Sequence, residues 1–259
     1  MDILFLDEVL IAVHKPAGLL VHRSLIDKGA KTFALQLVRD LIGQRVYPVH
    51  RLDRPTSGVL LFARDPATAR ALVAQFTAGR VSKTYQAIVR GHTDAAGTID
   101  HALPEEVDRI ADPLADPHKP PQPAVTGYRR LATVELPFPV GRYRTARYSL
   151  LELSPQTGRR HQLRRHLKHI FHPIIGDTTH GDGRHNCFFR EQFGNARLLL
   201  VATRVCLDHP TTGQRLRIEA PPAEDFASTA RALGWNLATQ SLRESPSLMC
   251  CNPDPNAAS

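Results

Sequence analysis

The sequence has few cysteines and no long apolar segment. Its four cysteines show no Cys-x-x-Cys spacing, and two of them, Cys250 and Cys251, are adjacent, so neither a disulfide framework nor a thiolate zinc site is indicated. The longest apolar runs have five residues (9–13, 59–63 and 198–202), whereas a membrane-spanning helix needs about 20. The N-terminus carries acids rather than a basic start, so we expect no secretory signal. These absences predict a cytoplasmic protein without membrane contact.

Positive charge is in excess and is unevenly distributed. Lys plus Arg number 33 and Asp plus Glu number 25, a net charge of +8. Residues 158–169 hold five cations and no acid, and residues 127–147 hold five arginines against one acid, whereas residues 94–117 hold seven acids and one base. Guanidinium groups bind phosphate through two parallel hydrogen bonds. We therefore favour nucleic acid as a partner over the alternative of a solvated basic face.

The apolar spacing predicts a mixture of strands and helices. Strands are expected over residues 3–6, 9–13, 59–63, 81–89 and 148–153, and a hairpin over 198–207 and 216–219. Helices are expected over 33–41, from Asp65 as N-cap to Gly79, over 163–170 and over 226–237. The acidic, proline-rich stretch 91–123 is expected to be irregular. Because strands and helices do not alternate strictly, the predicted fold class is α+β with an extended, mixed, mostly antiparallel sheet.

One expected helix combines an apolar stripe with the basic cluster of 158–169. Leu163, Leu167 and Ile170 are spaced four and three apart and form one stripe of the helix. Arg164 lies about 100° from that stripe at 3.6 residues per turn. From such a semi-buried position its guanidinium can turn inward, so Arg164 is a candidate partner for a buried or half-buried acid.

A carboxylate between two arginines marks the loop 50–58, which reads His-Arg-Leu-Asp-Arg-Pro-Thr-Ser-Gly and precedes the buried strand from Val59. The cations beside Asp53 favour its ionised form. A carboxylate that stays charged at neutral pH can act as a general base, a nucleophile or a metal ligand. The competing interpretation is an aspartate that caps a turn while its arginines lie in water, and for an isolated Arg-Leu-Asp-Arg we would prefer it.

Further motifs along the chain favour a functional interpretation of this loop over a turn-capping one. His-Arg-Leu-Asp-x-x-Thr-Ser-Gly resembles the catalytic loop of the RluA-type pseudouridine synthases. The other motifs of that family have counterparts, in the same order, at Lys15–Gly18 with Val21-His22, at Lys83–Gly91, at Thr157–His166 and at His172–Asp177. The resemblance spans residues 3 to about 220. It implies a pseudouridine synthase fold with a central active-site cleft, and an isomerase that converts a uridine of RNA into pseudouridine.

The resemblance also implies roles for individual residues. Asp53 is the expected nucleophile, Arg164 its ion-pair partner, and Tyr85 the ring that stacks on the target uracil and assists removal of the C5 proton. The residues expected to bind substrate are Arg51, which fills the space left by the extracted base, Leu163, an apolar wall of the pocket, and the cations Arg160, Arg165 and Lys168. No cofactor and no metal are expected. The target uridine has to be flipped out of the RNA, at a few kcal/mol.

Three stretches, 20–24, 121–126 and 131–143, favour a tRNA-directed branch of the family, for which the target is uridine 65 in the T-stem. The alternative is an rRNA-directed synthase. We expect a catalytic domain over 1–220 with no N-terminal S4-type module, a C-terminal helix over 221–239 packed on it, and a flexible tail over 240–259. A monomer is expected.

Two functions outside this enzyme class compete with it. A non-catalytic basic RNA-binding domain would have no use for a semi-buried carboxylate, so the joint presence of Asp53, Tyr85 and Arg164 disfavours it. A metal hydrolase could use the histidines at 161, 166, 169 and 172. No acidic ligand lies near them in the sequence and five cations surround them, so a bound metal ion is disfavoured.

Overall fold

A computed structural model describes residues 1–22, 32–105 and 120–237 of the chain. The strands are β1 (Ile3–Leu6), β2 (Leu10–Lys15), β3 (Tyr47–Pro48), β4 (Ser57–Ala63), β5 (Ser82–Arg90), β6 (Ala96–Asp100), β7 (Val125–Leu136), β8 (Ala146–Pro155), β9 (Leu200–Asp208) and β10 (Arg215–Glu219). The helices are α1 (Ala34–Ile42), α2 (Pro66–Thr77), α3 (Gln162–His169), α4 (Gly183–Phe193) and α5 (Glu224–Ala232).

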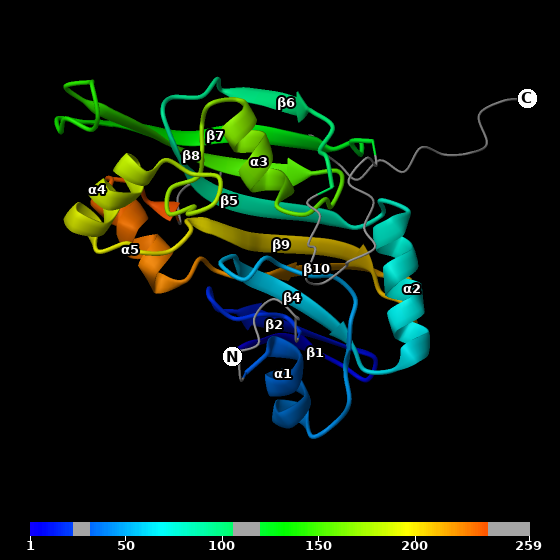
Figure 1. Cartoon of the computed structure of the whole chain (residues 1–259). Helices are drawn as coiled ribbons and strands as arrows, with labels where there is room; N and C mark the ends of the chain where they lie inside the picture. The colour runs from blue at the N-terminus through cyan, green and yellow to red at the C-terminus, as the bar shows by residue number, and fades with distance from the viewer. Residues whose placement is uncertain (23–31, 106–119, 238–259) are drawn as a thin grey trace, which may run out of the picture.

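All of these strands belong to one open sheet (Figure 1). Its main path runs β1-β2-β4-β9-β5-β8-β7-β6, while β10 pairs with β9 and β3 with β4. Every pairing is antiparallel except that of β4 with β9. The expected mixed, mostly antiparallel sheet is therefore confirmed. Because β4 and β9 come from distant parts of the chain, their pairing brings the loop before β4 against the C-terminal half.

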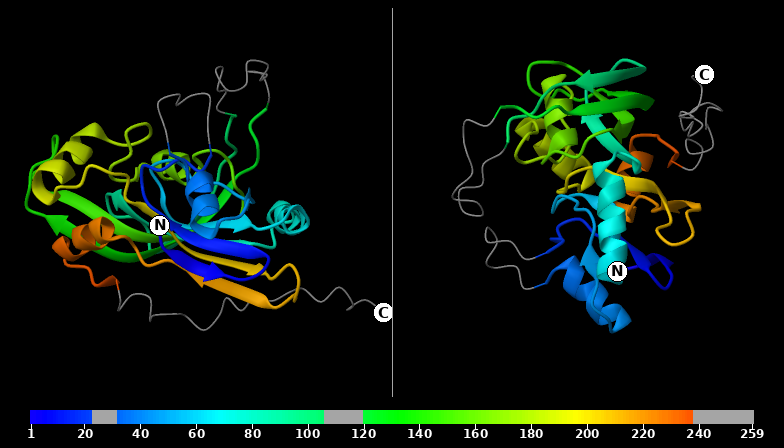
Figure 2. Two further views of the ribbon diagram at one scale, coloured as in Figure 1. Left: turned by 90° about the horizontal axis from the view of Figure 1, so that it is seen from below. Right: turned by 90° about the vertical axis from the view of Figure 1, so that its right-hand side faces the viewer.

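Helices cover both faces of the sheet (Figure 2). Alternate residues of β5 and β8 point to opposite faces, so Ala87 and Leu151 pack in one core cluster with Leu163 and Leu167 of α3. Their sequence neighbours pack in a second cluster with Phe188 and Phe189 of α4 and Phe226 of α5. Helix α3 is thus held on one face of the sheet by the apolar stripe that the sequence predicts. None of the helices in the described ranges is long and apolar enough to span a membrane.

Several sequence-based expectations were wrong. Stretch 91–123 is not wholly irregular, because it contains β6, which pairs with β7. Strand β7 and helix α4 were not predicted: residues of β7 are mostly half-buried, so its apolar alternation is weak. Helix α5 ends at Ala232, five residues before the predicted end, because Gly234 adopts φ +80°. The predicted tail 240–259 lies outside the described residues.

A glycine makes the junction of β4 and β9 possible. Gly58 has φ +114°, and a Cβ built on it would lie 2.1 Å from the carbonyl oxygen of Ala202. The parallel register pairs Gly58 with Ala202 and Ser57 with Val201. Any side chain at position 58 would push the two strands apart. The loop that ends at Ser57 is therefore seated tightly on β9, which fixes where Asp53 lies.

Candidate active site

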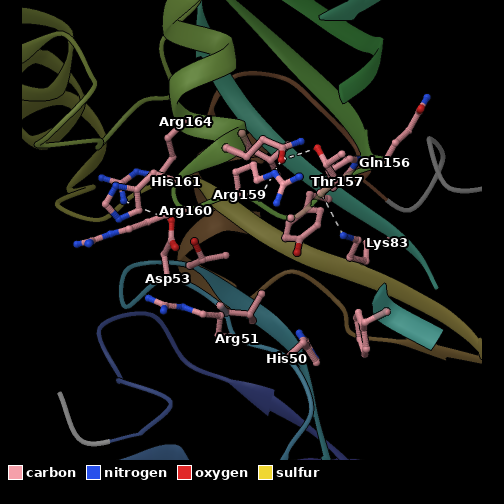
Figure 3. A pocket seen from close by; sticks show the side chains of 18 of the residues that line it. His50, Arg51, Asp53, Lys83, Gln156, Thr157, Arg159, Arg160, His161 and Arg164 are labelled. Carbon is pink, nitrogen blue, oxygen red and sulfur yellow. Dashed lines mark hydrogen bonds and ion pairs between the residues drawn. The ribbon is translucent and has the colours of Figure 1, made fainter. Parts of the chain in front are cut away.

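A cavity of about 770 Å³ opens between the loop before β4, the start of β5 and the segment leading into α3. Figure 3 shows the carboxylate of Asp53 pointing across this cavity toward Arg164, with Arg51 on the same loop and Lys83 on the opposite side. Tyr85 also lines it. The structure therefore brings Asp53, Tyr85 and Arg164 together from three distant parts of the chain, as the sequence motifs predict.

At the floor of the cavity Asp53 contacts the guanidinium of Arg164. Nη1 of Arg164 lies 3.4 Å from Oδ2 of Asp53. The Arg164 side chain is 5% exposed, whereas that of Asp53 is 20% exposed. The carboxylate is therefore the more accessible member of the pair, although both residues line the cavity. The arginine, expected to be semi-buried, is fully buried.

Arg164 is held mainly by a second carboxylate. Its Nε and Nη2 donate to the two carboxylate oxygens of Asp177 at 2.7 and 2.8 Å, a bidentate pair. Asp177 is 1% exposed. Burial raises the pKa of this carboxyl, but the hydrogen bonds from Arg164 and from the backbone N–H groups of His180 and Thr179 outweigh it, so the pKa lies below its ordinary value. Asp177 is therefore a charged, structural counterion.

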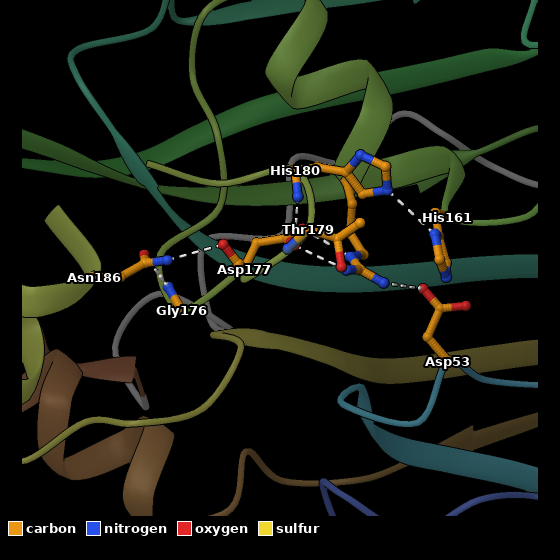
Figure 4. Close-up of polar contacts among 8 residues, drawn as sticks. Asp53, His161, Gly176, Asp177, Thr179, His180 and Asn186 are labelled. Atoms are coloured by element: carbon orange, nitrogen blue, oxygen red, sulfur yellow. Dashed lines mark hydrogen bonds and ion pairs between the residues drawn. The ribbon is translucent and has the colours of Figure 1, made fainter. Parts of the chain in front are cut away.

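The turn that presents Asp177 is itself tied down (Figure 4). Asn186 of α4 donates to the carbonyl of Asp177 at 2.8 Å and accepts the N–H of Gly176 at 2.7 Å. Gly176 has φ +79°, and a Cβ there would lie 1.8 Å from the carbonyl oxygen of Arg197. The position of Arg164 thus depends on a chain of contacts that reaches from α3 to α4.

Lys15 holds the other side of the site. Its ammonium is completely buried and donates to the carbonyls of Pro16, Leu19 and Arg54 at 2.9, 2.7 and 3.1 Å. The N–H of Gly18 also donates to the Arg54 carbonyl, at 2.8 Å. Because Arg54 follows Asp53 directly, these bonds clamp the loop around Asp53 to the turn after β2. Burial lowers the pKa of Lys15 to about 7, although the charge of Asp53 opposes this.

Tyr85 faces the cavity as a neutral phenol. It is partly buried and packs against two of the core clusters. Burial and the nearby charge of Asp53 raise its pKa above the ordinary value of 10.0. A bulge between Thr84 and Tyr85 shifts the pairing of β5 with β9 at this point and re-aims the residue. The ring is therefore suited to stack on a base, and at neutral pH its hydroxyl is protonated.

The predicted substrate-binding residues divide into two groups. Arg51, Leu163 and Arg160 line the cavity, and Leu163 is buried, as expected of an apolar wall. Arg165 and Lys168 are not among the lining residues. They lie on α3, with Arg165 half-buried and Lys168 exposed, because the inward faces of that helix carry Leu163, Arg164 and Leu167.

A second cavity, of about 1400 Å³, meets the first at the loop around Asp53. Arg51, Asp53, Arg160 and Arg164 line both. The second cavity extends past the turn after β2 toward α5 and includes Arg197. The carboxylate therefore lies where two hollows join, which suits a long ligand that passes through the cleft better than a small molecule enclosed in one pocket.

Several histidines near the site have structural partners. Nε2 of His50 accepts the N–H of Leu61 at 3.0 Å, and burial together with the charge of Lys83 lowers its pKa to about 4. His166 is buried between Thr126 and the carbonyl of His101. His161, at φ +53°, pairs with His180 at 3.1 Å between ring nitrogens. The described ranges contain no group of three or more side chains able to hold a metal ion.

Sequence reasoning assigned no role to two residues that build the site, Asp177 and Lys15. Asp177 ends the motif His172–Asp177, but it lies 13 positions from Arg164 across a helix end and a turn, so no local pattern links them. Lys15 has a clearer signal, because a lysine at the end of a mostly apolar, buried strand (Leu10–Lys15) has to find buried acceptors. The role of each depends on contacts that only the folded chain makes.

Residues 9–169 match a family model described as RNA pseudouridylate synthase, and the chain belongs to this family. The resemblance to RluA-type synthases is thereby confirmed. Curated relatives called tRNA pseudouridine synthase C include one from Yersinia pestis, 52% identical over 91% of this chain and 92% of its own length. Another, from Pectobacterium carotovorum subsp. carotovorum, is 54% identical over 91% of this chain and 62% of its own length.

Solved structures agree with the fold. "Human RNA Pseudouridylate Synthase Domain Containing 1" superposes with a TM-score of 0.69 at 24% identity, covering 95% of both chains. "Human RNA Pseudouridylate Synthase Domain Containing 4" gives 0.66 at 25% identity, covering 90% of this chain and 92% of its own. The α+β sheet with its cleft is the pseudouridine synthase fold.

Proposed function

We propose that this chain converts uridine 65 in the T-stem of tRNA into pseudouridine, with Asp53 as the nucleophile. The observation that carries the proposal is the partly exposed Asp53 carboxylate 3.4 Å from the buried Arg164 guanidinium at the floor of the cavity. Family membership supplies the reaction class. Relatives of about 50% identity that are named for tRNA support tRNA over rRNA.

The chemistry fits the contents of the cavity. The C1′–N1 bond of uridine breaks, a C1′–C5 bond forms, C5 loses its proton and N1 gains one. The freed uracil has to rotate inside a pocket that excludes water. Three routes are possible: attack of Asp53 on C6 of uracil, attack on C1′, and a glycal route. Each needs the Asp53 carboxylate charged and held in place, and the guanidinium of Arg164 holds it. Tyr85 and Leu163 offer a ring and an apolar wall for the base.

The test uses tRNA carrying tritium on C5 of its uridines. The wild-type chain should release tritium without added metal, and Asp53→Asn should reduce release to the level without enzyme. Binding of tRNA by Asp53→Asn should stay within a few fold of wild type. Asp40→Asn, the same change at an exposed carboxylate of α1, is the matched control and should keep full activity. Turnover by Asp53→Asn would remove Asp53 from its role.

The substrate is tested separately from the chemistry. A tRNA transcript with cytidine in place of uridine 65 should release no tritium above background, while the unaltered transcript does. Tritium release from labelled rRNA but not from tRNA would contradict tRNA as the substrate, while it would still support the isomerase reaction. Activity in the presence of a chelator, and sedimentation at the mass of a single chain, are the expected results for a metal-independent monomer.

A further inference from the structure

The β7–β8 hairpin ends in an exposed tip, residues 137–145, that the cavity does not use. Tyr143 is 60% exposed and Phe138 is 40% exposed. Arg142 and Arg144 flank Tyr143 and are exposed too. Exposed aromatic rings beside cations are the combination with which proteins stack bases and hold the backbone of nucleic acids. In Figure 1 this hairpin extends past the neighbouring strands at the end of the sheet where α4 lies.

The tip is basic, and the acid nearest to it in sequence is paired with another arginine. Glu135, the only acid of stretch 127–147, pairs with Arg147 at 3.0 Å and accepts a hydrogen bond from Thr145. A third cation, Arg184 at the start of α4, comes close to the tip, because its Nη1 would lie 3.3 Å from a Cβ on Gly141. The arginines of the tip therefore offer positive charge to an outside partner.

The tip is also ordered by its own contacts. The guanidinium of Arg142 lies 4.9 Å from the ring centroid of Tyr143 and donates to its hydroxyl at 2.7 Å. The ring of Phe138 lies 5.5 Å from that of Phe188 in α4, and Val140 is buried. These contacts anchor the base of the tip and leave Arg142, Tyr143 and Arg144 exposed. The conformational entropy cost of binding a partner is then smaller.

The register places the tip far from the reacting base. Tyr85 of the active site pairs with Leu153 of β8, and β8 begins at Ala146, seven residues earlier. At 3.4 Å per residue that span is roughly 24 Å. A group bound at the tip therefore belongs to a different part of the ligand from a nucleotide bound at Asp53.

We infer that the tip is a second RNA contact, which binds the phosphate backbone of tRNA outside the T-arm that carries the target uridine. The inference rests on the proposed function. Arginine pairs with phosphate, and an exposed tyrosine can stack on a base or pack on a ribose. The tip thus adds affinity for whole tRNA without touching the chemistry at Asp53.

The test compares binding of full-length tRNA with binding of the isolated T-arm stem-loop, both by the full chain. R142A/R144A should weaken the affinity for full-length tRNA roughly tenfold and leave that for the stem-loop unchanged. The slope of log affinity against log salt should become shallower by about 2, one for each phosphate that the variant no longer binds. R142E/R144E should weaken binding of full-length tRNA further, and Y143A should weaken it without changing the slope.

The matched control is R215A/R217A, which removes the same charge from exposed positions of β10 at the opposite end of the sheet. It should leave both affinities unchanged. Equal affinities of R142A/R144A and wild type for full-length tRNA would overturn the inference, as would equal losses for tRNA and stem-loop. A tip that instead binds protein would give the first of these results. Tritium release by the wild-type chain tests the proposed function independently.

Discussion

Two carboxylates contact the same guanidinium in very different ways. Asp177 accepts two hydrogen bonds from Arg164, of 2.7 and 2.8 Å, and its side chain is 1% exposed. Asp53 lies 3.4 Å from one nitrogen of Arg164, and its side chain is 20% exposed. Asp177 also accepts two backbone N–H groups. The buried pair orients the guanidinium, and the partly exposed carboxylate stays accessible to a substrate. The site thus holds the guanidinium firmly through one carboxylate while leaving the other carboxylate open to the cavity.

The largest effect on stability should come from breaking the buried pair. Asp177→Asn leaves the charge of Arg164 buried and poorly compensated, so the free energy of unfolding should fall by about 3–5 kcal/mol. Urea denaturation at neutral pH measures it. Because the pKa of Asp177 is lowered in the folded state, its contribution is present above its unfolded pKa and is lost as the pH falls through the lower folded value. Below about pH 4 the wild type should therefore lose stability more steeply than Asp177→Asn.

The clamp on the Asp53 side should show its own pH dependence, at higher pH. The pKa of Lys15 falls from 10.5 to about 7 on folding, so between these values the unfolded chain binds more protons than the folded one. Stability from this group then rises with pH across the window, by up to about 1.4 kcal/mol per unit. The unfolding free energy of the wild type, relative to that of Lys15→Met, should therefore increase from about pH 7 to pH 10. A constant difference would show that the buried ammonium keeps its charge throughout.

The smallest effect on stability should come from Asp53→Asn. Its contact with Arg164 is longer and partly screened by solvent, so the free energy of unfolding should change by less than about 1 kcal/mol. Comparing it with Asp177→Asn in the same denaturation series sharpens the contrast between the two carboxylates. Activity should fall in both variants, but only Asp177→Asn should also lose stability. Equal destabilisation would mean that Asp53 shares the structural role of Asp177.

Much of the site was predictable because its parts are short, local patterns. The loop around Asp53, the strand that carries Tyr85 and the helix that carries Arg164 each fall where the sequence places them. The apolar stripe of Leu163 and Leu167 correctly predicts the inward face of α3. Elements whose stability comes from neighbouring strands were harder to predict. Strands β6 and β7 pair with each other, and their own apolar alternation is weak.

By itself, the sequence determined the family, the basic character and the identity of the charged residues, because these depend on residue types at close spacing. Only the tertiary structure decided that Asp177 rather than Asp53 is the main partner of Arg164, that Lys15 holds the loop around Asp53, and that Arg165 and Lys168 lie outside the cavity. Such choices depend on which groups meet in a low-dielectric interior, where an unpaired charge is costly. Spacing along the chain does not report which buried groups come within hydrogen-bond distance.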